Sequence, residues 1–298
     1  MNTPAPLIHA PALTKPFTVA VITNVYNERH NLPVWLGHYG RQVGSAQCIV
    51  LDHGSNDGST EDLKGAGVIR LARGESYNER HRMALITNLA NSLLGYYDAV
   101  IYTDCDEMVV ADPAKYENLV DYARQHDRPA SFCIGFNLRH DPDSQPPLQD
   151  DIPVLTQRPL AQFVSAMCKP LLIRKPVSWG GGFHCCQHKP VFDDLYLFHL
   201  RHADMTRSLE RLKVTRQIKF AREGGGKHQR RDDAEAMKIF ENVKKIPVEE
   251  SFDMEPHLTK HLSFIGKSFS GRYSVQKGSI GTMARYLNRI PERFRSVV

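Results

Sequence analysis

The first third of the chain alternates regularly between strand-like and helix-like segments, and this alternation limits the fold more than any other feature. Apolar runs rich in β-branched residues lie at 18–25, 47–52, 68–72 and 98–103. Apolar residues at helical spacing mark the stretches 31–42 and 78–97 between them. Strands separated by helices of this length favour a parallel sheet with helices on both faces. We therefore expect an α/β fold built on a mostly parallel, Rossmann-like sheet.

Polar residues follow three of these predicted strands at the point where each strand ends. "NVYNE" follows the first strand, "DHGSND" the second and "DCDE" the fourth. In open parallel sheets, ligands bind beyond the carboxyl ends of the strands. The three segments therefore predict one binding site at this edge of the sheet.

The segment "DCDE" contains two aspartates, Asp104 and Asp106, directly after a buried strand. Residues two apart on an extended chain point the same way, and carboxylates are costly to remove from water without a partner. No lysine or arginine lies between Asp98 and Val110. A hard divalent cation is a suitable partner for such a pair, so the sequence predicts a metal site here.

Composition excludes several classes of protein. The net charge of +5 fits a phosphate-bearing partner but is too small to indicate binding to nucleic acid. No stretch approaches the roughly 18 to 20 apolar residues of a transmembrane helix, and the N-terminus has no secretory signal pattern. Six cysteines without repeated spacing read as reduced thiols. We expect a location in the cytoplasm or at the inner face of the membrane.

Three segments together resemble the signatures of glycosyltransferase family 2 with the GT-A fold. They are "VITNVYNERHNL", "IVLDHGSNDGST" and "YTDCDEMVV", and the resemblance covers roughly residues 17 to 205. In that family the opening strand ends in a YNE-type turn, the second in D-x-G-S-x-D-G-T and the fourth in DxD. The chain departs from the pattern at Asp52-His53, where many members carry two aspartates.

The resemblance implies a GT-A-type sheet flanked by helices, with a C-terminal helical extension. We divide the chain into a flexible leader (1–16), a glycosyltransferase domain (17–203) and a mainly helical extension (204–298). Within the domain, 17–110 would be the nucleotide-binding half and 111–203 the acceptor half.

The resemblance also implies roles for residues around the nucleotide. Asn24, Tyr26 and Glu28 would line the nucleotide pocket, with Tyr26 near the base or ribose. Asp52 would hydrogen-bond the base, and Asp57 would brace the turn. For Tyr26 and Asp52, packing at the core edge and local turn formation are the structural alternatives.

Further implied roles concern the diphosphate. Asp104 would face the ribose or a metal-bound water, and Asp106 would ligate Mn²⁺ or Mg²⁺. His199 would be a further metal ligand unless it is a core residue, and Arg82 would grip the diphosphate unless it lies on a solvated helix face. The chemistry requires a cation, because a departing nucleoside diphosphate gathers negative charge.

Transfer to a hydroxyl group also needs a proton acceptor. Asp194 and His184 are the first candidates, since the family supplies this group from the region after the DxD strand and three glycines precede His184. Asp150, Asp151 and Asp193 are other acidic candidates. The glycine-rich segment 222–233 is either a lid over the diphosphate or a solvated linker.

These features predict an inverting, metal-dependent glycosyltransferase that uses a nucleotide-sugar donor, with UDP-sugar as first choice. The acceptor would be a glycan or lipid-linked hydroxyl compound in surface polysaccharide synthesis, with peripheral contact to the inner membrane. Two alternatives remain open. One is a nucleotidyltransferase, although the turn after the first strand lacks the glycines of that class. The other is a non-catalytic domain that binds a nucleotide sugar or glycan.

Overall fold

The computed structural model describes residues 15–221, 230–252, 266–267, 271–275 and 283–298. Almost all of the predicted leader (1–16) lies outside the described residues, as does 222–229, the larger part of the predicted lid or linker.

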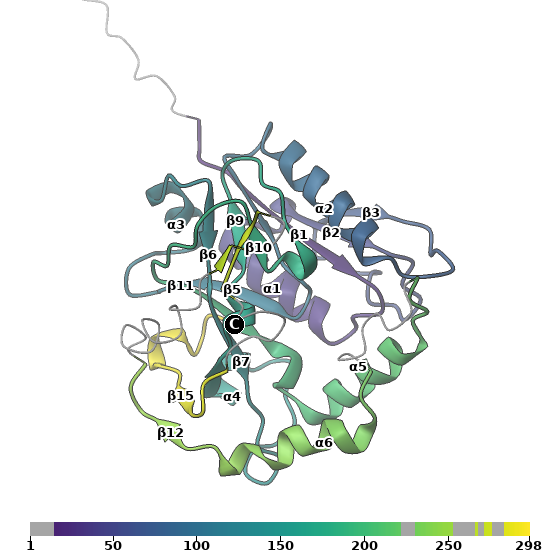
Figure 1. The fold of residues 1–298 in the computed structure, drawn as a ribbon, viewed down its shortest axis with the longest axis vertical. Helices are drawn as coiled ribbons and strands as arrows, with labels where there is room; N and C mark the ends of the chain where they lie inside the picture. The colour runs from purple at the N-terminus through teal and green to yellow at the C-terminus, as the bar shows by residue number, and fades with distance from the viewer. Residues whose placement is uncertain (1–14, 222–229, 253–265, 268–270, 276–282) are drawn as a thin grey trace, which may run out of the picture.

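The first sheet has the order β3-β2-β1-β4-β9-β6 (Figure 1). Its four parallel strands are β1 (Val19–Val25), β2 (Cys48–Asp52), β3 (Gly67–Arg70) and β4 (Ala99–Tyr102). Two antiparallel strands, β9 (Pro170–Ile173) and β6 (Ala130–Phe132), complete the sheet. This order confirms the predicted α/β fold with a mostly parallel, Rossmann-like sheet.

A second sheet of six strands, which the sequence did not indicate as separate, has the order β12-β15-β8-β7-β11-β5. Its strands are β5 (Glu107–Ala111), β7 (Ile134–Leu138), β8 (Leu160–Phe163), β11 (Leu195–His199), β12 (Val248–Glu249) and β15 (Leu287–Arg289). The chain leaves the first sheet after β4 and enters the second at β5. The acidic turn between β4 and β5 therefore lies where the two sheets meet.

A small third sheet consists of β10 (Cys185–Cys186), β14 (Tyr273–Ser274) and β13 (Gly266–Lys267). The helix α1 (Asn31–Val43) and the short α3 (Leu119–Gln125) pack against β1, and α2 (Glu79–Leu93) packs against β4. The apolar face of α1 is buried as its spacing predicts, with Trp35 and Tyr39 completely inaccessible to solvent.

The C-terminal extension begins as predicted with helices α5 (Met205–Gln217) and α6 (Asp233–Glu241), which lie at one side of the molecule (Figure 1). Beyond α6 the described part of the extension is not uniformly helical: β12 and β15 add to the second sheet, and a short 3-10 helix follows at Glu292–Phe294. The remaining short helix, α4 (Val154–Gln157), precedes β8. Among the described helices, none has the length and apolar character needed to cross a membrane.

Candidate functional site

A cavity of about 2310 Å³ opens at the carboxyl ends of β1 and β4. The loops after these strands, the first turns of α2, the end of β11 and the inner face of α5 line it. Single ligands usually occupy roughly 300 to 1,000 Å³. The cavity therefore has room for two ligands side by side.

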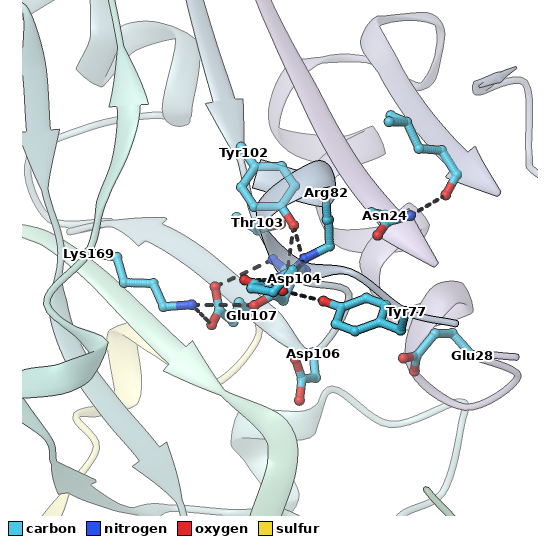
Figure 2. A network of polar contacts seen from close by, with 12 residues as sticks. Asn24, Glu28, Tyr77, Arg82, Tyr102, Thr103, Asp104, Asp106, Glu107 and Lys169 are labelled. Carbon is cyan, nitrogen blue, oxygen red and sulfur yellow. Dashed lines mark hydrogen bonds and ion pairs between the residues drawn. The ribbon is translucent and has the colours of Figure 1, made fainter. Parts of the chain in front are cut away.

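Asp104 lies on the cavity wall in a network of hydrogen bonds and ion pairs (Figure 2). Its Oδ1 accepts hydrogen bonds from Arg82 Nη1 (2.8 Å) and the Tyr102 hydroxyl (2.9 Å). Lys169 Nζ lies 3.4 Å from its Oδ2. Burial raises the pKa of Asp104, but Arg82 and Lys169 outweigh it and hold the pKa far below its usual value.

Glu107 shares the cation of Lys169, whose ammonium group lies 2.5 Å from Glu107 Oε1. The side chains of both residues are almost fully buried. Burial raises the pKa of Glu107 and Lys169 opposes the shift.

The expectation that this acidic turn lacks nearby cations is wrong in three dimensions. Arg82 and Lys169 are 22 and 65 positions away from Asp104 in the sequence, and both reach it. A metal ion at the Asp104 oxygens would have to displace these cations. The predicted role of Asp104 as a metal ligand is thus not supported by this arrangement, whereas Arg82 lies on the cavity and not on a solvated face.

Asp106 lies apart from this network (Figure 2) and contacts His199. His199 Nε2 lies 3.1 Å from Asp106 Oδ2, and His199 Nδ1 lies 2.8 Å from Asn137 Oδ1. Burial raises the pKa of Asp106, but His199 outweighs it, and the pKa lies below its usual value. The sequence prediction paired these two residues, and the structure brings them together at the ends of adjacent antiparallel strands.

The pair fits a divalent cation in part. When His199 Nδ1–H donates a hydrogen bond to Asn137 Oδ1, the lone pair on His199 Nε2 points toward a carboxylate oxygen of Asp106. A cation bound by this nitrogen and this oxygen would satisfy both atoms. No group of three or more His, Cys, Asp or Glu side chains suited to a metal occurs in the described part of the chain. Mg²⁺-type sites commonly use one or two carboxylates and take the rest from water and substrate phosphates. Asp106 supplies one such carboxylate, and His199 would add an imidazole nitrogen.

Glu28 lies on the same cavity and is nearly buried. Its carboxylate contacts Arg211 Nη2 at 2.7 Å and accepts a hydrogen bond from Asn31 at 3.0 Å. Burial raises the pKa of Glu28 to about 7, although Arg211 acts in the opposite direction. Sequence reasoning missed Arg211, because one arginine in a basic helix gives no sign of where it points.

One side of the cavity is lined by Asn24 and Tyr26, which the sequence predicts to bind a nucleotide, and by His53. The Asn24 amide donates a hydrogen bond to the Leu51 carbonyl oxygen at 3.0 Å. The Arg73 guanidinium lies over the Tyr26 ring, 3.5 Å from its centroid. This direct cation–π contact fixes Arg73 on the face of the Tyr26 ring.

The predicted contact between Asp52 and the base is wrong, because Asp52 does not line the cavity. Its carboxylate accepts hydrogen bonds from Ser55 N (2.8 Å), Thr60 Oγ1 (3.1 Å) and Arg70 Nη1 (2.9 Å). These three hydrogen bonds satisfy the carboxylate of a residue that is only 3% exposed. Asp52 therefore stabilises the turn that follows β2. The next residue, His53, reaches the cavity instead.

The two predicted proton acceptors lie in different places. His184 lines the cavity, with Nδ1 2.6 Å from the Ala166 carbonyl oxygen. Burial and Lys169 lower its pKa to about 3. Asp194 immediately precedes β11, at the opposite end of the strand from His199. Its carboxylate lies 2.9 Å from Lys115 Nζ. Asp194 is not among the residues that line the cavity, so it is too distant to be the base of this site.

The other acidic candidates, Asp150, Asp151 and Asp193, do not line the cavity, and Asp151 is exposed. Asp193 pairs with Arg128, and Asp150 pairs with Arg207 at 2.7 Å. Asp57 does line the cavity, and it accepts hydrogen bonds from the backbone N–H groups of Ser59 (3.0 Å) and Arg29 (3.2 Å). These bonds brace the turn as the sequence predicts.

No family model and no curated protein matches this chain. Solved structures match parts of it. A mannosyltransferase from Pyrobaculum calidifontis, solved with GDP-Man and Mn²⁺, is 18% identical with a TM-score of 0.27. That match covers 47% of this chain and 40% of the mannosyltransferase, so the chain spans less than half of that protein.

Two further matches have similar scores. TarS 1-349 from S. aureus is 12% identical with a TM-score of 0.35, over 83% of this chain and 79% of that one. A cytidylyltransferase from Leptospira borgpetersenii is 15% identical with a TM-score of 0.27, over 41% and 54%. Similarity at this level leaves the activity of this chain to be inferred from its own residues.

Proposed function

We propose that this protein is a metal-dependent, inverting glycosyltransferase that moves a sugar from a nucleotide-sugar donor to a hydroxyl acceptor. The pair of Asp106 and His199 on a cavity large enough for two substrates is the observation that carries the proposal. The cavity lies at the carboxyl ends of parallel strands, where nucleotides bind in such sheets.

The donor would lie with its base near Tyr26, His53 and Arg73 and its diphosphate near Asp106. A divalent cation at Asp106 and His199 would neutralise charge on the leaving diphosphate. Arg82 and Lys169 hold Asp104 in a fixed position beside this proposed metal site. We keep a uridine diphosphate sugar as first choice for the donor.

The proposed proton acceptor for the acceptor hydroxyl is His184. Its bond to the Ala166 carbonyl oxygen fixes the proton on Nδ1 and leaves Nε2 to accept. A pKa of about 3 keeps the ring neutral in the physiological range, so Nε2 can accept a hydrogen bond from the hydroxyl, but it also makes His184 a weak base. Replacement by Gln should reduce turnover and leave donor binding intact.

The test is thermal stability of the purified protein with UDP, GDP, CDP or ADP, with and without Mn²⁺. One nucleotide at one hundred times its Kd should stabilise the fold by about 2.7 kcal/mol, and only with metal present. Asp106→Asn should abolish the increase in Tm, whereas the matched control Asp194→Asn, outside the cavity, should retain it.

A flat response to all four nucleotides would refute the proposal. Nucleotide binding with no turnover, and with no slow hydrolysis of the donor, would instead favour the non-catalytic alternative.

A further inference from the structure

Arg73, Arg80, Arg201 and Arg231 line the cavity and form no ion pair with a carboxylate in the described part of the chain. Arg73 lies over the Tyr26 ring, and Arg80 is exposed on the first turn of α2. Arg201 follows His199 at the end of β11, and Arg231 lies just before α6. Most other basic groups of the cavity are matched: Arg82 with Asp104, Lys169 with Glu107, and Arg211 with Glu28.

The charges around Arg201 are those of Asp106, Arg231 and Arg211. Burial and the two arginines lower the pKa of Arg201, and Asp106 acts in the opposite direction. Nearby acidic groups offer no further compensation, since Asp204 caps α5 and lies 3.8 Å from Arg158. The wall around Arg201 and Arg231 thus carries uncompensated positive charge.

A neighbouring side chain also lacks a partner. His202 lines the cavity beside Arg201, and its Nδ1 atom is buried with no hydrogen bond in the described structure. Buried polar atoms nearly always have a partner, which can be a bound ligand. This observation is independent of the arginine charges and points to the same place.

The basic groups of the cavity form two sets. Arg82 and Lys169 face Asp104, and Arg73 lies on Tyr26 on the proposed nucleotide side. Arg201 faces Asp106 from the end of β11, and Arg231, on the C-terminal extension, lies close enough to Arg201 to lower its pKa. The proposed function places the donor diphosphate at Asp106, close to Arg201. The second set is free for another anion where the diphosphate approaches Asp106 from the side of Arg82.

We propose that Arg201 and Arg231, with His202 beside them, form a binding site for a phosphate group on the acceptor. Two guanidinium groups match a phosphate monoester, which carries about −1.5 to −2 charge at neutral pH; a carboxylate would neutralise only one. This inference rests on the proposed function, and it names the acceptor class as a phosphorylated hydroxyl compound.

The first measurement is a calorimetric titration of the protein with inorganic phosphate. Arg231→Gln should weaken phosphate binding about tenfold, which corresponds to about 1.4 kcal/mol. Arg201→Lys, which keeps the charge but loses the planar fork, should weaken it less. The control Arg80→Gln removes another cavity arginine, on α2, and should change the affinity less than about twofold.

Arg231 is exposed, so its replacement should leave Tm unchanged and any loss of binding is not a folding defect. Absence of phosphate binding to the unmodified protein, or equal loss in Arg80→Gln, would overturn the site.

A second titration distinguishes acceptor from donor. Phosphate is titrated into protein saturated with the nucleoside diphosphate and Mn²⁺ that stabilise it. Unchanged phosphate affinity supports a separate acceptor site. Competition between the two would overturn the assignment, because the arginines would then hold the donor diphosphate. If no nucleotide binds but phosphate binding still depends on Arg231, the oxyanion site stands and the proposed function fails.

Discussion

The ammonium group of Lys169 lies between two carboxylates, and all three groups are withdrawn from bulk water to different extents. The side chains of Lys169 and Glu107 are 3% and 2% exposed, whereas that of Asp104 is 28% exposed. Removal of one partner from a buried ion pair leaves a charge without compensation.

We therefore expect Lys169→Met to destabilise the fold by about 3 kcal/mol. Urea unfolding at neutral pH measures the loss. Adding Glu107→Gln should restore part of it, because the uncompensated charge is then gone. The control Lys175→Met changes an exposed lysine and should have little effect. An equal loss in the single and double variants would show that packing, and not charge, holds Lys169 in place.

Glu28 makes stability depend on pH. Its pKa is raised from 4.5 to about 7 by burial. Between these values the folded protein holds a proton that the unfolded chain has released, so stability falls as pH rises through this window. A shift of this size corresponds to a loss on the order of 3 kcal/mol.

Glu28→Gln should flatten this pH dependence. Unfolding free energies at pH 5 and pH 8, without added metal, should differ less in the variant than in the unmodified protein. Glu61→Gln, an exposed control, should keep the original slope. The same slope in Glu28→Gln would mean that another group titrates in this window.

At the scale of elements, the N-cap of α2 connects local sequence to the site. Asn78 Oδ1 accepts hydrogen bonds from the backbone N–H groups of Arg80 (3.0 Å) and His81 (3.3 Å). This cap fixes the first turns of the helix that carries Arg82. Asn78→Ala should cost about 1 kcal/mol and speed amide hydrogen exchange in the first turns of α2, whereas Asn78→Ser should retain most of the stability. Equal exchange in both variants would contradict the role of the cap.

Helix α5 is fastened to the loop after β1 by one side chain. Arg211 Nη1 donates hydrogen bonds to the carbonyl oxygens of Tyr26 (2.8 Å) and Asn27 (3.1 Å) and its Nη2 pairs with Glu28. We expect Arg211→Gln to cost about 2 kcal/mol and to increase hydrogen exchange in α5. Lys213→Gln on the same helix is the control. Unchanged exchange in Arg211→Gln would show that α5 is held elsewhere.

Elements with local signals were predictable, and those defined by distant pairing were not. The β1, β2 and β4 strands and α2 follow from apolar periodicity within one segment. Strand β5 joins a second sheet because it pairs with β11, far along the chain, and no local pattern encodes that choice. Asp106 and His199 could be predicted because each lies in a local motif of its own. The ion pair between Lys169 and Asp104 could not, because it joins residues far apart in the sequence.

At the scale of the molecule, the C-terminal segment ties the two sheets together. Phe294 is completely buried, with its ring centroid 5.2 Å from that of Tyr196 in β11. Next to it, Arg293 makes two hydrogen bonds to Asp112, at 2.8 and 2.9 Å. The ring nitrogens of His38, on α1, lie 2.8 and 3.1 Å from the carbonyl oxygens of Val109 and Val297. Loosening this segment should therefore affect both sheets.

Phe294→Ala should destabilise the whole protein by about 4 kcal/mol, because it removes a large buried ring and leaves a cavity. The only two tryptophans, Trp35 and Trp179, are buried against the first sheet, so their fluorescence reports on it, whereas far-UV circular dichroism reports on both sheets. The two urea transitions should coincide and shift together in the variant, and Ser296→Ala should leave them in place. A fluorescence midpoint that stays fixed while the dichroism transition splits would mean that the sheets unfold separately.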